Sequence, residues 1–233
     1  MNEDIIMLEL SMPAGDLAEP IHPVILRDEK GCALIDCGFV GSLPLIEAQL
    51  ALHGLHGEDI HAILLTHHDH DHMGAAAAFK RKYPRVKVYA SSLEAPYISG
   101  EEKPWRLRQA EDMQKTLPPD QQAFGRWFCD LLRRVEPVSV DETLEDGDVL
   151  PWCGGCDVIA TPGHTPGHIS LWLRGQDTII AGDAMISDGG RPALANPGFA
   201  LDAEQARDAM DMLLDMRAGR ILCYHGGELV TAP

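Results

Sequence analysis

Leu64-Leu65-Thr66-His67-His68-Asp69-His70-Asp71-His72-Met73-Gly74 is the stretch that decides how this chain is interpreted. An apolar strand, predicted over residues 62–65, ends here and runs into six consecutive histidine or aspartate residues. Such side chains are rarely buried unless something pairs with them. Imidazole nitrogens and carboxylate oxygens bind divalent metals such as Zn²⁺ or Fe²⁺, and α/β proteins place their sites in loops at strand ends. The stretch predicts a metal site, because a solvated polar turn or an artificial histidine run would leave the later motifs unexplained.

Composition limits the class of protein and its partners. The chain has 233 residues and 45% apolar content, which fits one α/β domain of ordinary large size or at most two small ones. The net charge of −17 argues against a nucleic-acid partner or an anionic membrane, since both need a basic face. No apolar run reaches membrane-span length, and Met1-Asn2-Glu3-Asp4 shows no basic signal region. We therefore expect a cytoplasmic protein.

The six cysteines predict no disulfide framework in a reducing compartment, where they are expected to be small buried residues. Cys153-Gly154-Gly155-Cys156 has the CxxC spacing of redox or metal sites. No second CxxC exists, and the two glycines lie between strand-like runs, which favours a hairpin turn.

The order of predicted elements outside the histidine stretch is typical of an α/β layered protein. Strands are predicted over 5–10, 24–26, 32–35 and 86–90, with helices over 42–54 and 74–83. After about residue 135 short strands resume, over 138–140, 149–152, 157–160, 169–173, 178–181 and 221–224, with a helix over 202–216 capped by Asp202.

Residues 93–135 interrupt this order with two predicted helices. In the second, six apolar residues recur at helical spacing: Phe124, Trp127, Phe128, Leu131, Leu132 and Val135. This insertion is either a helical hairpin packed on the core or on a second subunit, or a lid whose apolar residues shape a substrate pocket. Its apolar face makes a homodimer plausible.

Three later segments each present a histidine or aspartate, usually beside glycine, where a short apolar strand stops. They are Thr161-Pro162-Gly163-His164-Thr165-Pro166-Gly167-His168, Gly182-Asp183 and Tyr224-His225-Gly226-Gly227. Side chains at strand ends can converge on one edge of a sheet sandwich. Four such segments in order are hard to attribute to chance.

On these four motifs, together with Leu34-Ile35-Asp36-Cys37-Gly38, the sequence resembles the metallo-β-lactamase superfamily over nearly its whole length. The resemblance implies an α/β (α+β) fold, a four-layer αββα sandwich, here a single domain over 1–233 with a helical insertion at about 93–135. It also implies two divalent metal ions, most often zinc and sometimes iron or manganese.

The resemblance assigns the metal ligands residue by residue. His67 and His164 correspond to ligands of a first metal, Asp71, His72 and His225 to ligands of a second, and Asp183 to the carboxylate that bridges both. The catalytic residues it implies are Asp183 and Asp71, which could also carry a proton to the leaving group.

One position departs from the family's His-x-His-x-Asp-His signature, because Asp69 stands where the second histidine is expected. Asp69 could replace the imidazole as a ligand of the first metal. Alternatively, a small change in the loop could bring His70 or His68 into this ligand position. Alternatively the first site is weak and one metal suffices. A carboxylate would shift the site toward harder cations such as iron or manganese.

The function implied is a metal-dependent hydrolase that uses a metal-bound hydroxide to cleave an ester, thioester, lactone or related bond in a small molecule. Alternatives are an iron-dependent oxidoreductase, although no flavin-binding domain follows the motifs, and a non-catalytic binding protein. Ile186 stands where lactone-cleaving members tend to carry tyrosine. The general, glyoxalase-II-like branch fits best, and the substrate itself is not readable.

Other residues near the motifs are open to two interpretations. Asp36 could orient the histidine loop or be a turn residue. His168 is expected to be structural or to orient a ligand rather than to bind metal. Histidines outside any motif are expected at the surface or in turns: His22, His53, His56 and His61.

Overall fold

The computed structural model describes residues 4–11 and 19–231 of the chain. Residues 1–3, which belong to the segment that argued against an export signal, lie outside this described part. Within the described ranges, no helix combines the length and the apolar character needed to cross a bilayer.

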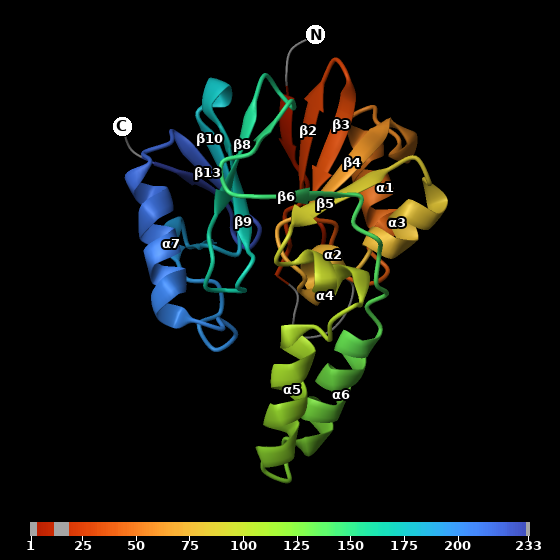
Figure 1. The fold of residues 1–233 in the computed structure, drawn as a ribbon, viewed down its shortest axis with the longest axis vertical. Helices are drawn as coiled ribbons and strands as arrows, with labels where there is room; N and C mark the ends of the chain where they lie inside the picture. Colours follow the sequence, from red (N-terminus) through yellow and green to blue (C-terminus); the bar gives the residue numbers. More distant parts are fainter. Residues whose placement is uncertain (1–3, 12–18, 232–233) are drawn as a thin grey trace.

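Two six-stranded sheets form the body of the molecule (Figure 1). The first has the order β1 (Asp4–Met7), β2 (Val24–Asp28), β3 (Gly31–Ile35), β4 (Ile60–Leu65), β5 (Lys87–Ser91) and β6 (Glu142–Leu144). The second has the order β14 (Gly227–Val230), β13 (Arg220–Cys223), β10 (Thr178–Gly182), β9 (Ile169–Leu173), β8 (Cys156–Ala160) and β7 (Val149–Leu150). A small two-stranded sheet pairs β11 (Ile186–Asp188) with β12 (Arg191–Ala193).

Strands β3 and β4 show why their sequences are apolar at nearly every position. Ala62 and Leu64 of β4 pack into the cluster between the two sheets, whereas Ile63 and Leu65 pack into the cluster beneath the helices of the first sheet. Because successive side chains of a strand point to opposite faces, a strand covered on both faces must be apolar throughout.

Helices cover the two outer faces (Figure 1). The helices and 3-10 turns are α1 (Leu43–Leu52), η1 (Gly57–Asp59), α2 (His70–Met73), α3 (Ala76–Lys82), α4 (Ala95–Ser99), α5 (Trp105–Thr116), α6 (Gln122–Arg133), η2 (Arg174–Gln176) and α7 (Ala203–Asp215). Ile46 and Leu50 of α1 and Phe79 of α3 pack on the first sheet, and Leu213 of α7 packs on the second. The prediction of a four-layer αββα sandwich is confirmed.

Helices α5 and α6 form a hairpin that projects from one end of the sandwich (Figure 1). Ala110, Phe128, Cys129 and Leu132 are buried in a small core of their own, whereas Phe124 and Trp127 on the predicted apolar stripe are exposed. The expected single domain and the expected dimer through this hairpin both stay predictions.

Two predicted elements differ in place from the observed ones. Residues 138–140 are not a strand, because pairing with β5 begins only at Glu142; the Val138 backbone N–H instead donates to Ile98 O at 2.9 Å. The helix predicted from Gly74 is preceded by a separate turn, α2, which begins inside the histidine stretch because His72 N–H and Met73 N–H both donate to Asp69 O.

Candidate metal centre

Four strand ends bring the predicted ligands to one place. His67 follows β4, His164 lies between β8 and β9, Asp183 follows β10, and His225 follows β13. Because β4 and β10 lie in different sheets, the ligands come from both halves of the sandwich. Seven side chains meet here: His67, Asp69, Asp71, His72, His164, Asp183 and His225.

The first group of ligand atoms belongs to His67, Asp69 and His164, all buried. Asp69 Oδ2 lies 3.6 Å from His67 Nε2 and 3.1 Å from His164 Nε2. The second group belongs to Asp71, His72 and His225, with Asp71 Oδ2 3.8 Å from His72 Nε2 and 3.3 Å from His225 Nε2.

Asp183 faces both groups, one oxygen to each. Its Oδ2 lies 3.4 Å from His164 Nε2, whereas its Oδ1 lies 3.3 Å from His72 Nε2 and 3.5 Å from His225 Nε2. The preceding residue must be glycine, because Gly182 has φ +54° and a Cβ there would lie 2.7 Å from His168 Nε2.

Asp36 orients imidazoles of both groups, which settles its two interpretations in favour of orientation. Its carboxylate accepts from Thr66 N–H at 2.9 Å, from Thr66 Oγ1 at 2.8 Å and from His72 Nδ1 at 2.8 Å. Since the Thr66 hydroxyl donates its proton to Asp36, His67 Nδ1 donates to Thr66 Oγ1 at 3.0 Å. Both imidazoles therefore present an unprotonated Nε2 to the centre once they are neutral.

His168 uses both ring nitrogens inside the protein. Its Nε2 accepts from Asp183 N–H at 2.9 Å, so its Nδ1 carries the proton donated to Thr161 Oγ1 at 2.8 Å. This buried ring holds the backbone of Asp183 and has no nitrogen left for a metal. His22 differs from expectation, since it is buried and its Nδ1 lies 3.2 Å from Tyr224 O.

The structure places Asp69, and neither neighbouring histidine, beside His67 and His164. His68 Nδ1 pairs with the buried Glu94, and its Nε2 accepts from Trp105 N–H at 3.2 Å. His70 packs its ring against Phe39 and Phe128.

Three residues that matter here were not singled out from the sequence. Glu94 also accepts from His68 N–H, Thr165 Oγ1 and Gly167 N–H, so it joins two ligand loops. Tyr224 donates its hydroxyl to Asp71 O at 2.5 Å, and its ring packs against His72 at a tilt of 31°. Arg106 of α5 is 3% exposed and reaches Asp69. Only Tyr224, next to His225, stands within a predicted motif.

Opposite charges in this buried cluster shift each other's pKa values. Burial alone would raise the pKa of Asp69, but the Arg106 guanidinium, with His164 and His67, holds it well below its usual value. Burial likewise would lower the pKa of His72, yet the carboxylates of Asp183, Asp36 and Asp71 raise it well above its usual value.

The donor set fits divalent cations. Buried polar groups normally have hydrogen-bond partners, yet His67 Nε2, His72 Nε2 and Asp183 Oδ1 have none among the described residues. All three atoms lie in one group whose ligand atoms are within 4.8 Å of one another. Imidazole nitrogen and carboxylate oxygen in this mixture suit zinc, iron or manganese.

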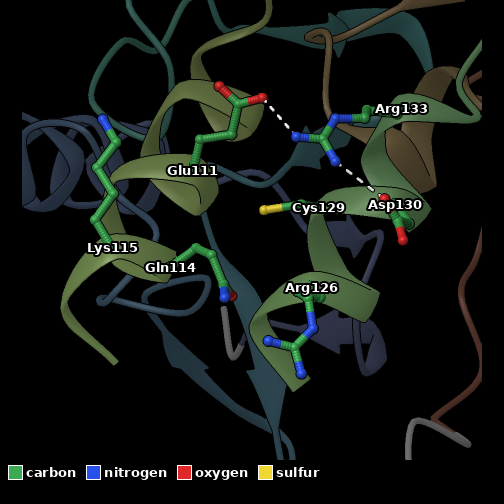
Figure 2. A pocket seen from close by; sticks show the side chains of 7 residues that line it. All are labelled: Glu111, Gln114, Lys115, Arg126, Cys129, Asp130 and Arg133. Carbon is green, nitrogen blue, oxygen red and sulfur yellow. Dashed lines mark hydrogen bonds and ion pairs between the residues drawn. The ribbon is translucent and has the colours of Figure 1, made fainter. Parts of the chain in front are cut away.

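Two cavities are lined by residues of the α5–α6 hairpin. The larger, about 410 Å³, is lined by Glu111, Gln114, Lys115, Arg126, Cys129, Asp130 and Arg133, none of which belongs to the cluster (Figure 2). The smaller, about 170 Å³, is lined by Arg106, Gln109, Ala110, Met113, Phe128, Gly198 and Phe199. Arg106 contacts Asp69 and His164 as well, so the smaller cavity adjoins the cluster.

Gly163→Ala is expected to destabilise the fold by about 1–3 kcal/mol, because the strained backbone and the steric overlap act together. Gly163 has φ +131°, and a Cβ there would lie 2.1 Å from the backbone N of Ala206 at the start of α7. Thermal unfolding would measure the loss. Gly175→Ala is the matched control, since its Cβ would meet nothing within 4 Å; equal losses in both variants would contradict the prediction.

Comparison with known proteins agrees with this geometry. The family model described as the metallo-beta-lactamase superfamily matches residues 18–225. The chain belongs to the metallo-β-lactamase superfamily. It is 35% identical over 156 residues to "Probable metallo-hydrolase YflN" of Bacillus subtilis, covering 66% of this chain and 55% of that protein.

Two further proteins are similar to this chain at lower sequence identity. The chain is 28% identical over 166 residues to "Hydroxyacylglutathione hydrolase" of Aeromonas hydrophila, covering 71% of this chain and 46% of that protein. It therefore spans about half the length of these curated relatives. The crystal structure of metallo-beta-lactamase family protein TTHA1429 from Thermus thermophilus matches with TM-score 0.76 and 23% identity, covering 97% of this chain and 74% of that one.

Proposed function

We propose that this superfamily member is a metal-dependent hydrolase that cleaves an ester, thioester, lactone or related bond of a small molecule. The observation that carries the proposal is Asp183, whose two oxygens face two separate groups of buried ligand atoms. The relatives named metallo-hydrolase and hydroxyacylglutathione hydrolase support the same reaction class.

In this proposal His67, Asp69 and His164 would hold one cation and Asp71, His72 and His225 a second, with one oxygen of Asp183 facing each group. When bound, two cations supply a water with a pKa lowered to about 7 and polarise the substrate oxygen. Asp36 and Thr66 fix the imidazole orientations, and His168 fixes the backbone of Asp183. Asp71 is the carboxylate proposed to pass a proton to the leaving group.

The substrate is proposed to enter beside His225, the most exposed of the seven ligands at 26% of its side chain. The apolar walls of the smaller cavity, Phe128 and Phe199, would hold a short apolar part of it. At about 170 Å³ this cavity is smaller than the roughly 300–1,000 Å³ of sites that enclose a whole ligand.

The experiment is a hydrolysis screen across thioesters, lactones and phosphodiesters with metal-loaded protein, using Asp183→Ala as the negative control. Activity that Asp183→Ala abolishes supports the proposal, and activity that survives this substitution would refute the assigned roles.

A second candidate, iron-dependent oxygen or sulfur chemistry, is favoured by one observation. Asp69 adds a carboxylate to the first ligand group, which suits harder cations. Metal analysis of protein purified without added metal separates the two: zinc favours hydrolysis, and stoichiometric iron with oxygen consumption favours the alternative.

Zinc is expected to stabilise the metal-free protein, by about 2.7 kcal/mol at a hundredfold excess over Kd. This gain should grow with pH. The raised pKa of His72 means that a proton must leave before Nε2 can bind zinc. The same raised pKa stabilises the metal-free fold below the ordinary histidine pKa, and that contribution is lost as the pH rises. As the pH rises, the zinc-induced gain therefore increases while the contribution of His72 to the stability of the metal-free fold decreases.

Calorimetric unfolding with and without zinc, at about pH 6 and about pH 8, measures this difference. His225→Ala should shrink the zinc-induced gain, whereas His53→Ala, at an exposed position, should not. A gain that stayed constant or fell with pH would contradict the prediction.

A further inference from the structure

We propose that Arg106 competes with a cation for the ligand atoms of His67, Asp69 and His164. The Asp71–His72–His225 position therefore fills first, and the His67–Asp69–His164 position fills second and more weakly. This inference rests on the proposed two-cation centre. It assigns a role to a residue of the helical insertion that no sequence motif marks.

Four of the five N–H donors of the Arg106 guanidinium have an oxygen acceptor, and the fifth can donate to His164 Nε2 when that nitrogen carries no proton. Its Nη1 donates to Gln109 Oε1 and to Phe199 O, each at 2.6 Å. Its Nε donates to Asp69 Oδ2 at 3.0 Å, and its Nη2 lies 2.6 Å from Asp69 Oδ2 and 3.1 Å from His164 Nε2. A side chain satisfied in this way is held firmly in one place.

Two of the three ligand atoms of the first group are therefore already engaged. Oδ2 is the Asp69 oxygen that faces His67 and His164, and it receives two donors of the guanidinium fork. His164 Nε2, the nitrogen that would bind a cation, lies within hydrogen-bond distance of Nη2. A cation entering this position must displace or weaken these contacts and must tolerate a fixed positive charge nearby.

In the described part of the chain, no guanidinium or ammonium group pairs with the second group. Asp71, His72 and His225 have no arginine or lysine ion pair among the interactions of the described residues. Burial makes the difference important, because the Arg106 and Asp69 side chains are only 3% and 6% exposed and screening there is weak. The two cation positions are thus unequal.

The residue responsible for this inequality belongs to the helical insertion. Arg106 lies in the first turn of α5 and Gln109 one turn later, and both line the smaller cavity with Phe199.

The test is a titration of the metal-free chain with Zn²⁺ against a chromophoric chelator, with circular dichroism to check folding. Wild-type chain should bind two equivalents, the first about tenfold or more tightly than the second. His225→Ala should remove the tight step and His164→Ala the weak one. Arg106→Gln should tighten the weak step by about tenfold and leave the tight step unchanged.

Graded variants keep the test valid if Arg106→Gln does not fold. Arg106→Lys keeps the charge but not the fork, and Gln109→Ala removes one anchor of Nη1; each should tighten the weak step by less than Arg106→Gln. Arg108→Gln is the matched control on α5, since Arg108 pairs with the exposed Glu102, and it should change neither step.

Two equal steps in the wild-type chain, or a weak step that no Arg106 or Gln109 variant tightens, would overturn the proposal. These outcomes concern zinc binding alone, and the separate hydrolysis screen reports activity. If no zinc binds to folded protein, this inference and the proposed function both fail; equal zinc steps in an active hydrolase would refute this inference alone.

Discussion

Asp183→Asn is expected to lower kcat/KM by about 10²–10³-fold on the best substrate of the screen, while the fold is kept. Asparagine has nearly the same shape, and the Asp183 N–H can still donate to His168 Nε2. What is lost is the negative charge that faces His164 on one side and His72 and His225 on the other. Steady-state kinetics at fixed zinc concentration would measure the effect.

The matched control for Asp183→Asn is Asp188→Asn, an exposed aspartate in the neighbouring strand β11. It should retain full activity. Zinc content measured on both variants would show whether Asp183→Asn loses activity together with metal. Full activity in Asp183→Asn would show that the bridging role is wrong.

Glu94→Ala is expected to cost about 1–3 kcal/mol of folding free energy or more, because it leaves several buried hydrogen-bond donors without an acceptor. Glu94 is fully buried, pairs with His68, and accepts from Thr165 Oγ1 at 2.8 Å and from Gly167 N–H at 2.9 Å. The substitution would leave these donors without a partner and would loosen two ligand loops together. Denaturant unfolding would give the loss in free energy.

Two comparisons separate charge from packing at Glu94. Glu94→Gln keeps the shape and should cost less, whereas Glu102→Ala, at the surface, should stay within about 0.5 kcal/mol of wild type.

Burial alone would raise the pKa of Glu94, but His68 lowers it below the ordinary value of 4.5. A lowered pKa stabilises the fold above that value and is lost as the pH falls. The difference between wild type and Glu94→Gln should therefore shrink below about pH 4.5; a constant difference would contradict this origin.

The sandwich could be predicted from the sequence because its signals are local. Ala62 to Leu65 must be apolar on both faces of β4, and the stretch that follows cannot be buried without partners. Asp202 caps α7 as predicted, accepting from Glu204 N–H and Gln205 N–H. The hairpin turn at Cys153-Gly154-Gly155-Cys156 also follows from two adjacent glycines.

The supports of the centre could not be predicted, because they depend on tertiary contacts. Arg106 lies 37 positions from Asp69 and 58 from His164, in a helix whose sequence shows nothing unusual at that residue. Glu94 lies 26 positions from His68. Residues 138–140 have strand propensity, but the strand forms later, where Asp141 N–H reaches Val88 O. Spacing along the chain does not show which distant residues come into contact in the folded protein.

One carboxylate that belongs to neither ligand group nevertheless affects both. Asp36 contacts His72 directly and His67 through the Thr66 hydroxyl, and its backbone adopts φ +58°, which is unusual for a non-glycine residue. The orientations of His67 and His72 are therefore governed by a side chain 30 positions upstream of Thr66. In the proposed two-cation centre, an altered residue 36 would disturb the metal–metal distance, and a magnetic or X-ray absorption measurement would detect that change even with every ligand intact.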